Sequence, residues 1–433
     1  MTYGGTPSTT FAQSVTDGVA ASLAEVDAEL ARRFPGAPGT RQPVHTVYVP
    51  AGAVTPDTPR EWGARARALL DEHAPDAASL AAVLDLDPAL ARPVHERVRA
   101  KLEREPVEDL RIDFEDGYGV RGDAEEDEHA AQAARLAAAW GGGASGAGAA
   151  PGWAGIRMKC LEAGVRDRGI RTLDIFLTGL MEAGGLPGGL VLTLPKVSYA
   201  EQVAAMARLC EEFEKAHGLG PGRIGFEIQI ETTQAILGPD GRATVARMID
   251  AARGRATSLH YGTYDYSASC GVSAAHQAMD HPAADHAKAV MQVAAAGTGV
   301  RLSDGSTNVL PVGGREAVHA AWRLHHRLVG RSLARAYYQG WDMHPGHLVS
   351  RYAAVYAFYR AGMARAADRL AAYVARTATD VQDEPATARA LGDYLLRGVD
   401  CGALGAGEVA EATGLDRACL ERLAGRAAPA RAR

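Results

Sequence analysis

The sequence predicts an α/β protein, a (β/α)8 TIM barrel with a small C-terminal helical appendage. Two observations predict it. Short apolar segments alternate with Ala-rich amphipathic segments over roughly 300 residues, which is the layout of a barrel of eight strands and helices. Unusual polar residues, mostly acids, stand where the apolar segments end. The runner-up is a doubly wound open sheet, but no GxGxxG follows an early strand.

Eight segments have the strand pattern of apolar residues bounded by turn residues. In chain order they are residues 44–50, 109–116, 153–159, 189–196, 224–231, 258–265, 299–304 and 335–344, of which 299–304 is the weakest. Helical segments such as 201–216 and 315–334 separate them, and one long helix is expected over 347–377.

The chain therefore divides into three parts. Residues 1–42 form an N-terminal helical extension, and residues 43–377 form the barrel. Residues 378–433 form a C-terminal helical segment, which is either a lid over the barrel mouth or an oligomer contact.

Composition excludes several classes of protein. A formal net charge of −6 and a pI near 6.2 argue against nucleic-acid binding. Five cysteines are widely spaced and form no CxxC, which argues against a disulfide framework or a zinc site. The sequence has no signal-like start and no run of about 18 apolar residues. We expect a cytoplasmic protein without a membrane or nucleic-acid partner.

Two carboxylates close consecutive predicted strands. Glu231 ends residues 224–231, and Asp265 ends residues 258–265. Neighbouring parallel strands face the same mouth, and paired hard oxygens there suit Mg²⁺. The alternative is that both acids only cap the next helices, which we would favour for isolated acids but not for a pair. Gln229 lies on the same strand face as Glu231 and is placed to bind a substrate oxygen or a metal-bound water.

The second and third strands add acids and a guanidinium. Asp113, Glu115 and Asp116 end the second strand; Glu115 is expected to hold the waters of a metal, whereas the simpler interpretation is a solvated turn with Asp116 as a helix cap. Arg157, near the end of the third strand, could bind a substrate carboxylate through two N–H groups. The alternative is an ion pair with an acid of the second strand, and both can hold together.

Two lysines and a histidine follow other strands. Lys159 and Lys196 are further candidates for substrate binding; Lys196 either balances the acids or lies on the solvated rim. His344, which precedes Pro345 after the last strand, is interpreted as a structural residue of the turn rather than as a proton carrier.

Seven motifs in order resemble the HpcH/HpaI aldolase and citrate lyase β-subunit superfamily, with malyl-CoA lyase and malate synthase as more distant relatives. They are HTVYVPA, IDFEDGYG, GIRMK, LTLPKVSYAEQV, FEIQIETTQAI, YGTYDYSAS and WDMHPGHL, and they cover residues 44–350. Each motif alone is weak, but together and in order they are specific.

The resemblance implies a role for each matching residue. Glu231 and Asp265 would bind Mg²⁺ or Mn²⁺, and Arg157 would bind the carboxylate or oxo group of a small 2-oxo acid, with Asp113 and Glu115 supporting the metal. The family chemistry is aldol or Claisen carbon–carbon cleavage and its reverse. Barrels of this family commonly form trimers or hexamers, so a homo-oligomer is expected.

The sequence departs from the family pattern at several positions. Asp116 stands where HpaI-type aldolases carry a histidine, so the general base is unassigned and Asp116 is a catalytic candidate. Asp400 is the best match to an aspartate that completes the site in malyl-CoA lyase and malate synthase. The first loop, which in citrate lyase-type proteins offers basic residues to coenzyme A, is longer and differently charged here, although Arg60, Arg65 and Arg67 are present.

Three functions follow from these patterns. The leading hypothesis is a Mg²⁺-dependent lyase or aldolase acting on a small 2-oxo or 2-hydroxy acid through a metal-stabilised enolate. The second is malate synthase-like condensation or thioester hydrolysis on an acyl-CoA, with a CoA thioester as partner. The third is a non-catalytic barrel that keeps a metal site for stability.

Overall fold

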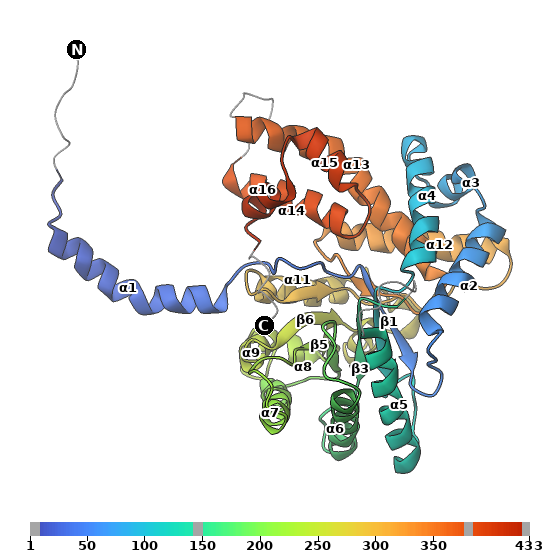
Figure 1. The fold of residues 1–433 in the computed structure, drawn as a ribbon, viewed down its shortest axis with the longest axis horizontal. Coiled ribbons are helices and arrows are strands. Elements are labelled where there is room, and N and C mark those ends of the chain that lie inside the picture. The colour runs from blue at the N-terminus through green and yellow to red at the C-terminus, as the bar shows by residue number, and fades with distance from the viewer. Residues whose placement is uncertain (1–8, 142–149, 376–383, 427–433) are drawn as a thin grey trace.

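A computed structural model describes residues 9–141, 150–375 and 384–426. Its eight parallel strands form a nearly closed barrel in the order β7-β6-β5-β4-β3-β2-β1-β8. A single bridge between Ser303 and Gln339 joins β7 to the segment leading into β8. The predicted fold class is confirmed (Figure 1). The strands are β1 (His45–Pro50), β2 (Asp109–Asp113), β3 (Trp153–Arg157), β4 (Leu192–Leu194), β5 (Phe226–Ile230), β6 (Ala256–Tyr261), β7 (Arg301–Ser303) and β8 (Gly340–Trp341).

Helices surround the barrel, and further helices precede it and follow it in the chain. Those of the barrel are α2 (Thr58–His73), α3 (Ala77–Leu84), α4 (Pro88–Arg104), α5 (Asp123–Gly141), α6 (Arg166–Glu182), α7 (Ala200–Ala216), α8 (Thr233–Ile236), α9 (Thr244–Ala251), α10 (Thr263–Ser269), the 3₁₀ turn η1 (Ala274–His276), α11 (Pro282–Ala295), α12 (Arg315–Ala334) and α13 (His347–Ala375). Before the barrel lies α1 (Gln13–Arg33), and after it lie α14 (Pro385–Asp400), α15 (Ala406–Thr413) and α16 (Arg417–Ala424). The predicted long helix is confirmed as α13 up to residue 375; residues 376 and 377 lie outside the described residues.

Polar side chains occupy alternate positions of β2 and β5, and apolar ones lie between them. Leu110 and Ile112 of β2 are fully buried, as expected for strand positions that pack against the surrounding helices. The other positions carry charged and amide groups. On β2 they are Asp109, Arg111 and Asp113, and on β5 with its end they are Glu227, Gln229 and Glu231.

Inside the barrel, before the carboxyl ends of the strands, the polar side chains form a layer of ion pairs. Arg111 Nη2 lies 2.8 Å from Glu227 Oε2, and its guanidinium also pairs with Asp109. His260 Nε2 lies 3.0 Å from Glu227 Oε2, and Thr193 donates a hydrogen bond of 2.5 Å to Glu227 Oε1. Each carboxylate in this layer therefore meets a basic group, as a buried charge requires.

The end of β6 corrects one prediction. The strand was expected to run to Asp265, but it ends at Tyr261, and Asp265 lies in the first turn of α10. Gly262 makes the transition: a Cβ there would lie 2.6 Å from the Cβ of Glu231, closer than real contacts allow. The chain leaves the sheet at this glycine, so Asp265 reaches the barrel mouth from a helix instead of from a strand.

The C-terminal helices lie at the amino ends of the strands. Arg397 of α14 donates a 3.0 Å hydrogen bond to Gln42, shortly before β1, and Arg97 of α4 donates one of 3.1 Å to Gly402 O. This placement does not put the segment over the carboxyl-end mouth, so the lid interpretation does not hold for this chain's own barrel. In Figure 1 these helices cover one side of the barrel. Within the described ranges, no helix is both long and apolar enough to cross a membrane.

Candidate metal and substrate site

Lys196 stands among four carboxylates at the carboxyl-end mouth. Its Nζ lies 2.8 Å from Asp265 Oδ2, 3.0 Å from Asp116 Oδ2 and 3.2 Å from Glu115 Oε1. Its backbone N–H donates a 2.7 Å hydrogen bond to Glu231 Oε1. Lys196 adopts a left-handed backbone with φ of 50°, which is uncommon for a residue with a side chain. The structure thus brings Glu231 and Asp265 to the same mouth, on either side of one lysine.

Burial shapes the protonation of two of these acids. Glu231 is 2% exposed, and its Oε2 accepts a 2.8 Å hydrogen bond from Gln229 Nε2. Burial raises the pKa of Glu231 to about 8, although Lys196 and Arg157 act to lower it. Burial likewise raises the pKa of Glu115 to about 7 against the effect of the same two cations. Both carboxyl groups therefore hold their protons more strongly than free ones do, because the two cations do not offset the cost of burial.

Acids outnumber cations at the mouth. Five carboxylates face two cations, which leaves three formal negative charges: Asp113, Glu115, Asp116, Glu231 and Asp265 against Arg157 and Lys196. Carboxylate oxygens are the ligands that Mg²⁺ takes in proteins, and a divalent ion would offset most of this surplus. The donor set fits Mg²⁺ or Mn²⁺, and Glu231 and Asp265, which both contact Lys196, are the residues that would hold it.

Arg157 is held on the same side of the mouth. Its Nε and Nη2 bond to the two oxygens of Asp113 at 2.7 and 2.8 Å. Its Nη1 lies 3.4 Å from both Glu115 Oε2 and Gln229 Oε1. The ion pair with the second strand therefore uses two of the three nitrogens, and one remains directed at the acid cluster. Arg157 could bind a substrate carboxylate through two N–H groups only if its ion pair with Asp113 broke.

Aromatic rings fix the guanidinium plane of Arg157. Its Cζ lies 4.7 Å from the ring centroid of Tyr48 and 5.6 Å from that of Trp341. The two rings contact each other at 4.6 Å. Neither Tyr48 nor Trp341 was predicted as a residue of the site. The sequence does place both aromatic residues near the ends of β1 and β8, and this position could have indicated a role at the mouth. These two strands pair with each other in the barrel.

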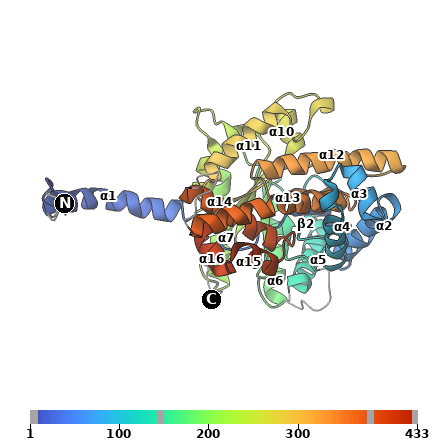
Figure 2. The same ribbon diagram turned by 90° about the horizontal axis from the view of Figure 1, so that it is seen from above.

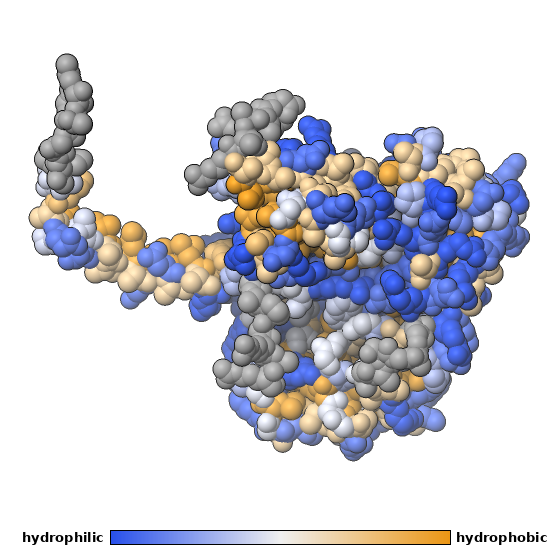
Figure 3. Space-filling model, turned by 45° about the horizontal axis from the view of Figure 1, so that its top comes forward, coloured by the Kyte–Doolittle hydropathy of each residue, from blue (hydrophilic) through white to orange (hydrophobic). Residues whose placement is uncertain are grey.

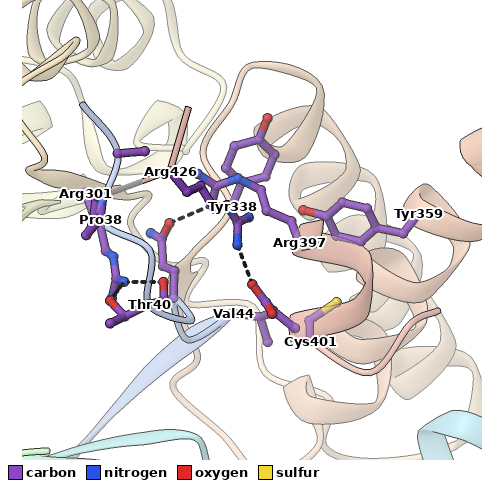
Figure 4. A pocket seen from close by; sticks show the side chains of 12 residues that line it. Pro38, Thr40, Val44, Arg301, Tyr338, Tyr359, Arg397, Cys401 and Arg426 are labelled. Carbon is purple, nitrogen blue, oxygen red and sulfur yellow. Dashed lines mark hydrogen bonds and ion pairs between the residues drawn. The ribbon is translucent and has the colours of Figure 1, made fainter. Parts of the chain in front are cut away.

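Two predicted site residues lie elsewhere. Lys159 Nζ binds Glu126 of α5 at 2.6 Å and the carbonyl of Phe114 at 3.0 Å, so it supports the barrel wall and does not join the cluster. Asp400 pairs with Arg417 and Arg426, each at 2.7 Å, in a pocket at the amino ends of the strands (Figure 4). The helix that carries Asp400 therefore packs on the face of this chain's own barrel opposite the acid cluster, and the catalytic role of Asp400 stays a prediction.

The arginines predicted for the first loop lie in helix α2, and two of them form ion pairs. Arg60 pairs with Asp57 at 2.6 Å, and Arg67 lies 3.8 Å from Glu103. His344 Nδ1 accepts a 3.0 Å hydrogen bond from the Gly346 N–H, which fits the structural role expected for it in the turn.

A second group of metal-type donors lies behind the mouth. Single donor atoms of His325, Asp342 and His347 lie within 4.8 Å of one another. The carboxylate of Asp342, however, already has basic partners on both oxygens. Arg351 binds it at 2.8 and 3.0 Å, and His45 and His325 approach it at 3.0 and 3.2 Å. Because the guanidinium already supplies the positive charge, this group is a buried ion-pair network that ties α12 and α13 to the sheet.

Fold and site together define a (β/α)8 barrel with an acidic cluster at the carboxyl ends of its strands. The chain belongs to the family described as Domain of unknown function (DUF6986), whose model matches residues 23–428. No curated protein sequence matches it.

Solved structures share the fold at low sequence identity. A citrate lyase from Burkholderia xenovorans LB400 has a TM-score of 0.56 and 18% identity, with 87% of this chain and 97% of that chain covered. The CitE protein of Mycobacterium tuberculosis, with magnesium, acetoacetate and coenzyme A, has a TM-score of 0.47 and 16% identity over 85% and 98%. A Haloferax volcanii malate synthase with magnesium and glyoxylate has a TM-score of 0.45 and 15% identity over 86% and 98%. The first supports the barrel fold alone, and the other two are too distant to add to it.

Proposed function

We propose that this protein is a Mg²⁺-dependent carbon–carbon lyase or aldolase that cleaves or forms a small 2-oxo or 2-hydroxy acid. The observation that carries the proposal is the surplus of negative charge at the mouth beside a buried arginine. A structural network such as that around Asp342 balances its charges, whereas this cluster does not. A surplus of oxygen ligands in a partly open site is typical of a cation-binding centre.

Each residue has a separate task in this proposal. Glu231 and Asp265 would bind Mg²⁺ or Mn²⁺, and Glu115 would hold its waters. When bound, the ion would supply positive charge to the oxygen that becomes an enolate. Nη1 of Arg157, now in 3.4 Å contacts with Glu115 and Gln229, would turn to the carboxylate or oxo oxygen of the acid. The amide of Gln229 would bind the same acid, and Lys196 would move its ammonium from the carboxylates toward the substrate.

The reaction requires one proton acceptor. In the cleavage direction a hydroxyl loses its proton, its carbon becomes a carbonyl, and the electrons of the broken carbon–carbon bond pass to the enolate of the other fragment. Asp116, or Glu115 through a water that it holds, would take this proton; both contact Lys196. The developing negative charge falls near Arg157 Nη1, which is where an oriented donor lowers a barrier most.

The direct test is a metal-dependent assay of the full chain. With Mg²⁺ and a panel of 2-hydroxy and 2-oxo acids, we expect release of pyruvate, glyoxylate or oxaloacetate, which EDTA stops and added Mg²⁺ restores. Glu231→Gln and Asp265→Asn should abolish it, whereas Glu211→Gln, on the exposed side of α7, should not. Activity that survives both site variants would refute the assignment.

The same experiment separates the alternatives. Product formation only with an acyl-CoA, together with saturable CoA binding, would favour the malate synthase-like function. A melting temperature that rises with Mg²⁺, without turnover of any acid or thioester, would favour a non-catalytic metal-binding barrel.

A further inference from the structure

A cationic pocket lies at the opposite end of the barrel from the acid cluster. Three arginines line it: Arg301 begins β7, Arg397 belongs to α14, and Arg426 follows α16 (Figure 4). Asp400 is the single acid in its lining, so the charged groups sum to two formal positive charges. Thr40, Gln42 and Tyr338 add neutral hydrogen-bonding groups to the wall.

One of the three arginines of the pocket has no carboxylate partner within the described part of the chain. Asp393 pairs with Arg397 at 2.6 Å and with Arg426 at 2.9 Å, and Asp400 pairs with Arg426 at 2.7 Å. Arg301 instead bonds through one nitrogen, Nη2, to the carbonyl and hydroxyl of Thr40, both at 2.6 Å. Among the described residues, no carboxylate lies within ion-pair distance of Arg301. Burial, with Arg397 and Arg426 nearby, lowers the pKa of Arg301 to about 10, so its charge is poorly compensated.

The size of the pocket limits the ligand. Its volume is about 40 Å³, room for about three water molecules or one carboxylate or phosphate group. A second cavity of about 280 Å³ adjoins it and shares Arg301, Arg397 and Tyr338. Apolar groups line much of this second cavity, among them Ala295, Val300, Leu302 and Ala336. A ligand with one anionic group and a short organic body matches both parts.

We propose that this face binds a small organic anion, a carboxylic acid or a phosphate ester, with its charged group on Arg301 and its body in the adjoining cavity. The site lies across the barrel from Lys196 and Glu231, so it serves an effector rather than the reacting molecule. Guanidinium groups suit this task because they bind both carboxylate and phosphate oxygens through paired N–H groups.

The test measures anion binding to the full chain in EDTA, so that no metal at the acidic mouth takes part. Inorganic phosphate and succinate should each raise the melting temperature saturably, whereas sodium chloride of equal ionic strength should not; the tighter of the two identifies the anion class. Arg301→Gln should weaken binding about tenfold or more, the effect expected for loss of a charged hydrogen-bonding partner.

Two further variants keep the result interpretable. Arg301→Lys preserves the charge and should retain part of the affinity if Gln at this position impairs folding. Arg323→Gln, at an exposed position of α12, should bind both anions like the parent. Equal binding by parent and Arg301→Gln, or no saturable shift in the parent, would overturn the proposal.

An independent observation concerns α1. This helix extends away from the barrel in two perpendicular views (Figures 1 and 2), and none of its 21 residues is buried. Large apolar side chains along it are about half exposed, and Figure 3 shows orange and tan groups along the helix. They are Val15 (49%), Val19 (54%), Leu23 (47%), Val26 (50%) and Leu30 (51%). An isolated helix of this length is only marginally stable in water. Its apolar stripe is therefore expected to pack against another surface.

The stripe is symmetric about its own centre. Two copies laid antiparallel about the midpoint between Ser22 and Leu23 place Val19 opposite Val26 and Val15 opposite Leu30. The flanking rings, Phe11 and Phe34, are also opposite each other. A two-fold contact needs this kind of self-complementary pattern, because each residue meets its counterpart twice. In the same register no acid of α1 faces another acid.

We infer that α1 pairs antiparallel with α1 of a second copy of this chain. Sedimentation analysis should show an even-numbered assembly that Leu23→Glu splits into halves, while Ala28→Glu, on the opposite side of the helix, leaves it whole. Under oxidation, the double variant Val19→Cys with Val26→Cys should form a disulfide between two copies, whereas Val19→Cys alone should not. The exposed native Cys270 is present in both variants, so it cannot cause a difference between them. A parent that sediments as a monomer at all concentrations, or equal linking by the single variant, would contradict the pairing.

Discussion

The two ends of the barrel carry opposite surpluses of charge. At the carboxyl ends of the strands, Glu231, Asp265 and their neighbours outnumber the cations. At the amino ends, Arg301 has no carboxylate partner among the described residues, and Arg397 and Arg426 lie beside it. Between these ends, the layer around Glu227 pairs each acid with a base. Balanced charges hold the fold together, and the sign of an unbalanced end indicates the charge of what it binds.

The largest expected effect would come from neutralising the acidic end. Glu231→Gln should lower metal-dependent turnover by on the order of 10²–10³-fold, as loss of a main electrostatic contact does elsewhere. The same variant should change the melting temperature in EDTA little near neutral pH, because burial raises the pKa of Glu231 to about 8 and the carboxyl is then mostly uncharged. Turnover measured with and without EDTA, beside thermal melts, checks both. A variant that loses activity and also melts lower would show that Glu231 mainly supports the fold.

Adding the missing charge should stabilise the protein. Mg²⁺ at about 100 times its dissociation constant should contribute about 2.7 kcal/mol to the free energy of unfolding. Thermal melts in Mg²⁺, Mn²⁺ and EDTA measure it, and Lys196→Met should increase the gain because its ammonium competes for the same acids. An identical melting temperature in all three buffers would remove the support for a metal at this end.

Acid should destabilise the part of the protein where α12 and α13 carry His326 and His347. Burial lowers the pKa of His347 to about 3 and that of His326 to about 4, below the ordinary value of 6.5. Between pH 6.5 and 4 the unfolded chain binds protons there that the folded chain does not, so stability present above pH 6.5 is lost as the pH falls. Each histidine should account for about 1–3 kcal/mol of this loss. Denaturant melts of His347→Gln should show a shallower pH slope than the parent; an unchanged slope would exclude His347 as a source.

The smallest effect on turnover is expected at Asp400. Because its carboxylate pairs with Arg417 and Arg426 at the basic end, Asp400→Asn should leave turnover within about twofold of the parent. It should strengthen phosphate binding about threefold, since one opposing charge leaves the pocket. Steady-state kinetics and phosphate titration give the two numbers. A large loss of turnover without loss of folding would return Asp400 to the catalytic site, through a neighbouring copy.

Strand pattern predicted the barrel well, and local sequence predicted the site in part. Strand ends on one sheet share one mouth, so Glu231, Arg157 and Lys196 could be placed together from sequence alone. Asp265 was assigned to a strand because HYGTYD continues the apolar pattern across Gly262. Lys159 and Asp400 lie away from the acid cluster because tertiary packing, which no local pattern contains, brings Glu126 and Arg426 to them.

The backbone of Lys196 makes this position a convenient one for redesign. Its main-chain N–H orients Glu231, so the side chain can be exchanged without loosening that carboxylate. Asparagine and glycine enter the left-handed region more readily than lysine does. Either replacement should relax the chain and remove the ammonium at once, which offers a single-codon route to tune which divalent ion the barrel prefers.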